Sequence, residues 1–399
     1  MADPSLILDR RAALAGKPGL HAVLIGVSEY ANLPSADDPP GDGLAALRRL
    51  RSSAISAYGL FQKLQALDAD GRLVRPLATV RLLHSPAPEE LAKEPALAAI
   101  GGAPATRSGI AKALDAWRTD VATARDNQAF FYFCGHGIRR SLEESILLAA
   151  DFLEPGSPKL FNSFRLSNVR NGMVPGASFP EIGREQFYFV DACREKPDAL
   201  DTLDTTETPK IFDAELGGLD DRRAPIFFAT MTGGVAAGLA AQPTFFANAL
   251  IWAMDNGSFG SRTMDNLGVV WPVTAPSLKV GIEASDALFD SRVELTGLVA
   301  DPVLCFRRDP PRLPLKVALA PEPLPAPVKT LSLTEMNTRA RLDISPSDHA
   351  GPLSVDVSAG MYQMTVKPRS KLFQRVRSDI LFLSIQSKMP LIFDLGAVP

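Results

Sequence analysis

The sequence predicts an α/β fold with a mostly parallel central sheet, followed by a small all-β module. Two observations support the first part: strand-like apolar runs alternate with helical segments between residues 20 and 306, and two of these strands end in reactive polar residues. A third observation supports the second part, because residues 329–399 contain short alternating runs separated by turn residues.

The expected elements of the α/β part follow in chain order. Strands are expected at 21–26, 80–83, 129–133, 186–190, 226–230 and 303–306, and helices within 44–64, 106–124, 245–254 and 271–306. The run at 21–26 is apolar throughout and ends in glycine, which is typical of a parallel strand covered on both faces. Because ligands bind beyond the carboxyl ends of parallel strands, the strands ending at 133 and 190 are expected to share one site.

Changes in composition divide the chain into segments. Residues 1–19 are interpreted as an N-terminal extension, and the α/β domain is expected to span 20–308. Within this domain we expect a first part at 20–193, a polar connecting loop at 194–223 and a second part at 224–308. Seven prolines predict a stiff linker over 309–328, and 329–399 is expected to form a small β-sandwich-like module.

Composition and charge exclude several classes of protein. With 399 residues, 46% of them hydrophobic, the chain can bury a large core, so it is not a disordered protein. Its 42 basic and 45 acidic residues nearly cancel, which argues against nucleic acid as a partner. Three cysteines are too few for a disulfide framework and none has metal-ligand spacing, so we expect a reducing, cytoplasmic location and no metal site.

Three further features have ordinary explanations. The uncharged stretch 224–254 is long enough to span a bilayer, but its glycine pair and its proline break any continuous helix, so no membrane association is expected. The apolar run at 6–8 is too short for the core of a signal peptide. Acidic pairs at 37–38 and 220–221 could bind Ca²⁺, but such unspaced pairs are usually solvated, and no cofactor is expected to be required.

Two polar motifs at strand ends predict nucleophilic chemistry. A thiol attacks a carbonyl only as a thiolate, which requires a nearby imidazole and hydrogen-bond donors for the oxyanion. Cys193 is the candidate nucleophile, and His136, which lies between Gly135 and Gly137, is the candidate general base. The backbone amides of Gly137 and Cys193 are candidate oxyanion donors. The simpler alternative for Cys193 is a buried structural role.

The residues around both motifs resemble a known family. FFYFCGHG at 130–137 and FYFVDACRE at 187–195 resemble the catalytic segments of bacterial caspase-like peptidases, close to metacaspases. The similarity extends to 21–34, 225–234 and 244–254. The resemblance implies a caspase-like α/β/α sandwich, a cysteine endopeptidase acting on protein substrates, and a role in bacterial defence or controlled cell death.

The resemblance also implies how the substrate is chosen. In metacaspases an aspartate two positions before the nucleophile lines the primary specificity (S1) pocket and selects Arg or Lys, and Asp191 matches it. Ser53 stands where the family often has a second pocket aspartate, and Cys134 stands where serine or alanine is common. Cys134 either lines the pocket wall or packs in the core. The alternative role for Asp191 is to cap or stabilise a turn.

The connecting loop suggests regulation by cleavage. It contains Lys210 and the pair Arg222-Arg223, after which an enzyme specific for basic residues could cut its own chain or be cut by an activating protease. A function of a different class is a catalytically silent caspase-fold scaffold that binds protein partners through its β module. The intact pair of Cys193 and His136 favours the peptidase.

Overall fold

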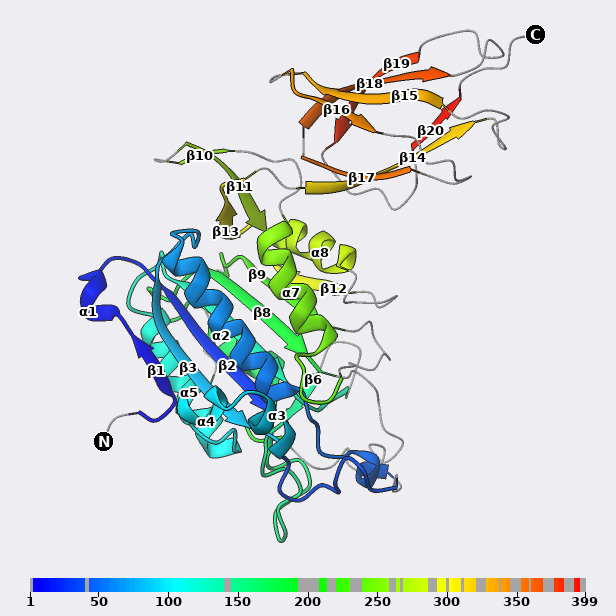
Figure 1. Ribbon diagram of the computed structural model, residues 1–399. Coiled ribbons are helices and arrows are strands. Elements are labelled where there is room, and N and C mark those ends of the chain that lie inside the picture. The colour runs from blue at the N-terminus through cyan, green and yellow to red at the C-terminus, as the bar shows by residue number, and fades with distance from the viewer. Residues whose placement is uncertain are drawn as a thin grey trace. The chain divides into compact units, whose positions relative to one another are not determined.

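A seven-stranded sheet organises the larger part of the chain (Figure 1). A computed structural model gives the structure over residues 3–39, 43–139, 145–192, 208–213, 220–229, 239–257, 263–265, 268–285, 293–298, 301–309, 312–320, 328–336, 339–344, 353–358, 360–368, 377–383 and 391–394. The chain divides into two units, one comprising Met1–Met254 and Thr274–Cys305, the other Asp255–Val273 and Phe306–Pro399.

The central sheet belongs to the first unit and is mostly parallel, as predicted. Its order is β1 (Leu6–Asp9), β3 (Leu77–Ser85), β2 (Leu20–Val27), β4 (Gln128–Cys134), β8 (Glu185–Asp191), β9 (Ala224–Phe228) and β12 (Glu294–Leu298). The five inner strands are parallel, and the two edge strands run antiparallel to their neighbours. Each strand predicted between 21 and 230 is present, which confirms the α/β reading.

Helices cover both faces of this sheet (Figure 1). α2 (Ser53–Ala69) and α7 (Phe245–Asn256) lie on one face, and α5 (Arg107–Val121) lies on the other. The other helices are α1 (Arg11–Leu14), η1 (Gly43–Ala46), α3 (Pro88–Lys93), α4 (Ala96–Ala99), α6 (Leu166–Gly172) and α8 (Ala275–Ala284). In the part of the chain that the structure describes, no helix is both long and apolar enough to cross a membrane.

The alternation of side chains along the strands decides what each helix covers. The ring of Phe131 on β4 lies 6.3 Å from that of Trp117 on α5, measured between centroids, so Phe131 faces α5. Tyr132 and Cys134 are offset from it by one and three positions and therefore face α2 and α7. Asp191 of β8 lies in register with Cys134 and points to the same face.

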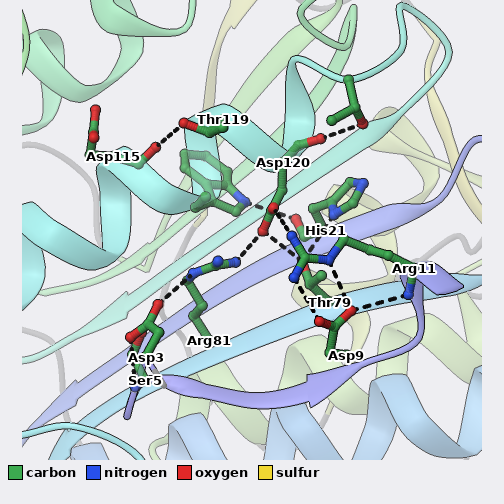
Figure 2. A network of polar contacts seen from close by, with 12 residues as sticks. Asp3, Ser5, Asp9, Arg11, His21, Thr79, Arg81, Asp115, Thr119 and Asp120 are labelled. Atoms are coloured by element: carbon green, nitrogen blue, oxygen red, sulfur yellow. Dashed lines mark hydrogen bonds and ion pairs between the residues drawn. The ribbon is translucent and has the colours of Figure 1, made fainter. Parts of the chain in front are cut away.

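The segment expected as an N-terminal extension contributes a strand to the sheet, because β1 lies within it. Leu6 of β1 lies opposite Arg81 of β3. Figure 2 shows the ionic network beside this strand pair: buried Arg81 is paired with Asp120 of α5, which also accepts from Arg11 Nη1 at 2.6 Å. Asp3 Oδ2 lies 3.4 Å from Arg81 Nε. Sequence pattern does not predict β1, because its apolar run is short and its partners are distant in the chain.

Three short strands follow the end of β4. β5 (Gly137–Arg139) pairs antiparallel with β6 (Ser145–Leu148), which pairs antiparallel with β7 (Ser163–Arg165). Further along, β13 (Val303–Arg307) crosses the division between the units and corresponds to the strand predicted at 303–306.

The second unit is built from strands, which confirms the all-β character predicted for the C-terminal module. β14 (Arg312–Ala320) pairs with β17 (Leu353–Ser358) and β20 (Leu391–Asp394) in one sheet. β15 (Val328–Glu335) pairs with β16 (Arg341–Ile344) and β18 (Gly360–Pro368), and β18 pairs with β19 (Arg377–Leu383), in another. β10 (Thr263–Asp265) and β11 (Gly268–Thr274) form an antiparallel pair.

The stiff linker expected at 309–328 is wrong over part of its length, because β14 lies inside it. The proline content suggested an extended, unpaired segment, yet Pro314 lies opposite Asp356 of β17. Proline is tolerated at this point because β20 joins β14 only from Val317 onward, so that β14 is still an edge strand at Pro314.

The buried ionic network predicts a large effect of one substitution. Asp120→Asn should lower the free energy of unfolding by about 3 kcal/mol, because it leaves the buried guanidinium of Arg81 without its main counter-charge. The matched control is Asp115→Asn on the same helix, which removes the exposed pair with Arg118 and should cost less than about 0.5 kcal/mol. Urea unfolding of both variants measures the difference, and equal small losses would contradict a structural role for the network.

Candidate active site

His136 lies just past the end of β4 and is held by a backbone carbonyl. Its side chain is buried, and its Nε2 lies 2.5 Å from the carbonyl oxygen of Arg48. Because a carbonyl oxygen can only accept, Nε2 must carry the proton and donate it. The other ring nitrogen, Nδ1, is then unprotonated and has a lone pair available to act as a base.

The backbone around His136 is held on both sides. The Tyr30 hydroxyl accepts from the His136 N–H at 2.7 Å, and the two rings lie 4.9 Å apart between centroids. The His136 carbonyl accepts from the Leu148 N–H at 3.0 Å. A Cβ on Gly135 would lie 2.8 Å from the Tyr30 hydroxyl, so any other residue there would require Tyr30 to shift. These contacts fix the position from which the imidazole projects.

Burial also sets the protonation state of this imidazole. The pKa of His136 is lowered to about 4, because a charged ring would lose its hydration, and the bond to the Arg48 carbonyl offsets this only partly. His136 is therefore neutral at neutral pH, as a general base must be before it accepts a proton. Sequence reasoning identified His136 but missed Tyr30 and Arg48, and Arg48 contributes only a backbone atom that carries no residue-type signal.

The residues expected to join His136 are partly placed. Cys193, including its amide, lies outside the described residues, which on this strand end with Asp191 and Ala192. Gly137, the other candidate oxyanion donor, begins β5 immediately after His136 and lies opposite Leu147 of β6. The strands that carry the two motifs, β4 and β8, are parallel, as the sequence predicted, and the structure shows that they are also adjacent.

Asp191 is a buried carboxyl with an uneven set of partners. Its Oδ2 accepts from the Tyr132 hydroxyl at 2.9 Å and from the Thr244 hydroxyl. Its Oδ1 is buried and has no hydrogen-bond partner within the described residues. Burial raises the pKa of Asp191 to about 6, and the hydroxyls of Thr244 and Tyr132, together with the nearby Cys134 thiol, limit the rise. This carboxyl therefore changes charge at a pH at which His136 stays neutral.

The structure brings together the three residues that the sequence assigned to the S1 pocket. Cys134 lies beside Asp191 on the neighbouring strand, and burial together with the nearby carboxyl raises the pKa of its thiol well above the usual value. A hydrogen bond with the Ser53 side chain acts in the opposite direction. Cys134 is thus both a core residue and a neighbour of the candidate pocket acid.

Two helices begin near the pair formed by Asp191 and Cys134. Thr244 caps α7, since its hydroxyl accepts from the Ala247 N–H at 3.1 Å, and Ser53 is the first residue of α2. The buried Glu90 carboxylate holds the start of α2 by accepting from the Ile55 N–H at 3.0 Å. The positive end of the α7 dipole favours a negative charge at Asp191. Sequence reasoning missed Thr244, although a threonine before an apolar helix is a recognisable cap.

The three candidate cleavage sites differ in accessibility. Arg222 is buried: its Nε and Nη2 donate to the carboxylate of Asp220 at 2.7 and 2.8 Å, and its Nη1 donates to the Arg170 carbonyl at 2.8 Å. It is therefore not presented to a protease as the sequence suggested. Arg223 has an exposed side chain, but its backbone N–H and carbonyl bond to the residues at the start of β8. Lys210 is exposed.

The acidic pairs considered for Ca²⁺ are engaged with protein groups. Asp37 is paired with Arg51, and Asp221 Oδ1 lies 2.6 Å from Arg184 Nε. Asp38 accepts from the Ser35 N–H at 2.7 Å. Over the described residues, no cluster of three potential metal ligands occurs.

The fold and these residues define an α/β protein with a buried imidazole and a buried carboxyl near adjacent strand ends. The family model for the caspase domain matches residues 20–271, and the chain belongs to this family, whose members are cysteine peptidases. The predicted family and caspase-like fold are therefore confirmed. A solved structure that is similar is caspase-1 from Spodoptera frugiperda, at 13% identity and a TM-score of 0.40 over 72% of this chain and 91% of that one. No curated protein matches the chain.

The raised pKa of Asp191 predicts a stability gain on its removal. Asp191→Asn keeps an oxygen that accepts from Tyr132 and Thr244 but removes a buried charge. Because the folded-state pKa of about 6 exceeds that of an unfolded aspartate, the wild type loses stability as the pH rises through this range. Thermal unfolding should show a gain on the order of 2 kcal/mol at pH 7.

The same pair of proteins supplies the control for this prediction. At pH 4 the carboxyl is protonated in the folded chain and partly protonated in the unfolded chain, so the difference between Asp191→Asn and wild type should fall to a small fraction of its value at pH 7. A variant that is less stable than wild type at pH 7 would show that the surroundings favour the ionised form.

Proposed function

We propose that this protein is a cysteine endopeptidase that cleaves protein substrates after Lys or Arg, with Cys193 as nucleophile and His136 as general base. The observation that supports this best is the hydrogen bond from His136 Nε2 to the Arg48 carbonyl, because it leaves Nδ1 as the basic nitrogen near the end of β4. The adjacent strand β8 ends two residues before Cys193 in the sequence.

The proposed reaction follows from these residues. His136 Nδ1 takes the proton of the Cys193 thiol, and the thiolate attacks the carbonyl carbon of the scissile peptide. The backbone amides of Gly137 and Cys193 donate to the oxyanion. The imidazolium then gives its proton to the leaving amine, and water hydrolyses the thioester with His136 again as base. These steps use protein groups and water, and no cofactor enters them.

Asp191 supplies the proposed preference for a basic side chain before the cleaved bond. Its Oδ1 is a buried acceptor without a hydrogen-bond partner among the described residues, and such an atom is costly unless a ligand pairs with it. A cationic side chain would pair with it and hold the carboxyl in its ionised form.

The proposal predicts Cys193-dependent hydrolysis. Fluorogenic peptides that differ only in their last residue before the dye, Lys, Arg or Asp, should be cleaved after Lys and Arg, and Cys193→Ala should lower kcat by about a thousandfold or more. Cys305→Ala is the matched control, because Cys305 is a buried cysteine whose thiol contacts the Met254 carbonyl at 3.6 Å. Failure to cleave any peptide, with or without Ca²⁺, would favour the scaffold function instead.

We further propose that cleavage within the connecting loop activates the enzyme and that Lys210 is the preferred site. Cutting after Arg222 would require breaking a buried ion pair, and cutting after Arg223 would require detaching the start of β9. At Lys210 the side chain is exposed, and the bond that follows it is held by side chains: the Lys210 carbonyl accepts from Arg107 Nη2 at 3.0 Å, and the Ile211 N–H donates to Asn168 Oδ1 at 2.6 Å. Lys210 is therefore the least costly of the three.

This ranking predicts which variant stops maturation. When expressed in parallel, Lys210→Gln should remain a single band on a denaturing gel, whereas wild type and Arg223→Gln should both be cut. Cys193→Ala separates self-cleavage from cleavage by another protease, since only self-cleavage requires the nucleophile. Normal processing of Lys210→Gln together with an uncut Arg223→Gln would reverse the ranking.

A further inference from the structure

Two hydroxyl groups from different elements occupy the same oxygen of the Asp191 carboxyl. Tyr132 on β4 donates to Oδ2 at 2.9 Å, and Thr244 at the start of α7 donates to the same atom. A carboxylate oxygen has two lone pairs, so Oδ2 is saturated by these two donors. Oδ1, which is also buried, is the one oxygen of this carboxyl open to a ligand among the groups described here.

The directions of these hydrogen bonds leave little room for rearrangement. The Thr244 hydroxyl accepts from the Ala247 N–H at 3.1 Å, so its single hydrogen is committed to Asp191. The Thr244 N–H donates to Ser56 Oγ at 2.9 Å, and Ser56 Oγ in turn donates to the Ser52 carbonyl at 2.6 Å. Turning Thr244 away from the carboxyl would therefore disturb the cap of α7 and its contact with α2.

This arrangement treats the two basic side chains differently. A guanidinium binds a carboxylate best through two parallel N–H bonds, one to each oxygen, whereas an ammonium behaves as a point charge and needs one good acceptor. With Oδ2 already occupied, the two-oxygen arrangement would displace a buried hydroxyl and leave it without a partner. An ammonium can use Oδ1 alone.

We propose that Tyr132 and Thr244 make the Asp191 pocket select lysine over arginine. This inference rests on the proposed function, in which Asp191 receives the side chain before the cleaved bond. Tyr132 and Thr244 are specificity-determining positioning residues: they act on the substrate through the carboxyl that they hold. The uncharged neighbours of Asp191, Cys134 and Ser53, add no second carboxylate that could receive the remaining N–H groups of a guanidinium.

The test measures binding separately from catalysis. On the full-length Cys193→Ala protein, calorimetry compares peptide amides that differ only in a last residue of Lys, Arg or norleucine. Lys should bind about fivefold more tightly than Arg, and norleucine should bind weakest. Adding Tyr132→Phe or Thr244→Val opens Oδ2 and should lower the Lys:Arg affinity ratio by about tenfold. The Lys:Arg affinity ratio is compared, not the separate affinities, because removing either donor also changes the ionisation of Asp191. That change affects the Lys and Arg peptides alike.

Control variants and outcomes keep the inference separate from the proposed function. Tyr132→Phe removes only a hydroxyl and leaves the cap of α7 intact, and Thr244→Ser keeps the hydroxyl and should keep the wild-type ratio. Tighter binding of Arg by the starting protein, or a ratio unchanged by Tyr132→Phe, overturns the inference. Equal affinity for the Lys and norleucine peptides overturns it as well, because Asp191 then does not bind the charged group of the lysine side chain. Loss of wild-type turnover in Cys193→Ala decides the peptidase function independently of all three results.

Discussion

The parallel register between β4 and β8 is the constraint on which the candidate site depends. It places Cys134 opposite Asp191, so the buried thiol and the buried carboxyl are neighbours by backbone pairing alone. Two residues beyond Cys134 the chain reaches His136, and two residues beyond Asp191 it reaches Cys193. A one-residue slip of this register would turn Asp191 toward α5 and away from the ends of α2 and α7.

Burial acts in opposite directions on the two titratable groups of the site. It keeps His136 neutral, which suits a base that must first receive a proton, and the Arg48 carbonyl then selects which nitrogen is available. At Asp191 burial opposes the charge that a cationic ligand requires, and the hydroxyls of Tyr132 and Thr244 offset part of that cost. A carboxyl kept at such a position destabilises the unliganded protein, which is common where a residue serves binding rather than folding.

The sequence predicted the strands of the central sheet and the grouping of Asp191, Cys134 and Ser53. The strands follow from a local pattern, because apolar runs mark buried strands, whereas the grouping follows from the resemblance of these positions to the metacaspase pocket. It did not predict Arg48 or Thr244 as partners. Arg48 acts through its carbonyl, which every residue type carries, and the bond from Thr244 to Asp191 joins residues 53 positions apart whose approach only the packed helix defines.

The errors in the sequence-based interpretation have a related cause. A dibasic pair suggested an exposed cleavage site, yet Arg222 forms a buried fork with Asp220 two residues earlier, and charge composition alone does not distinguish the two situations. Near β1, Asp3 and Arg11 of the segment interpreted as an extension pair with Arg81 and Asp120. Whether a charged residue is exposed or buried in an ion pair can be decided only when the position of its counter-charge is known.

The site is assembled from both sides of the connecting loop, which determines what cleavage of that loop can change. Asp191 precedes the loop and Thr244 follows it, and the hydrogen bond between them joins the two parts. β8 and β9 also pair directly, and the rings of Phe189 and Phe227 stack 4.8 Å apart across them. These contacts are buried and do not depend on a continuous chain. Cleavage after Lys210 would therefore leave these contacts between the two parts of the candidate pocket intact.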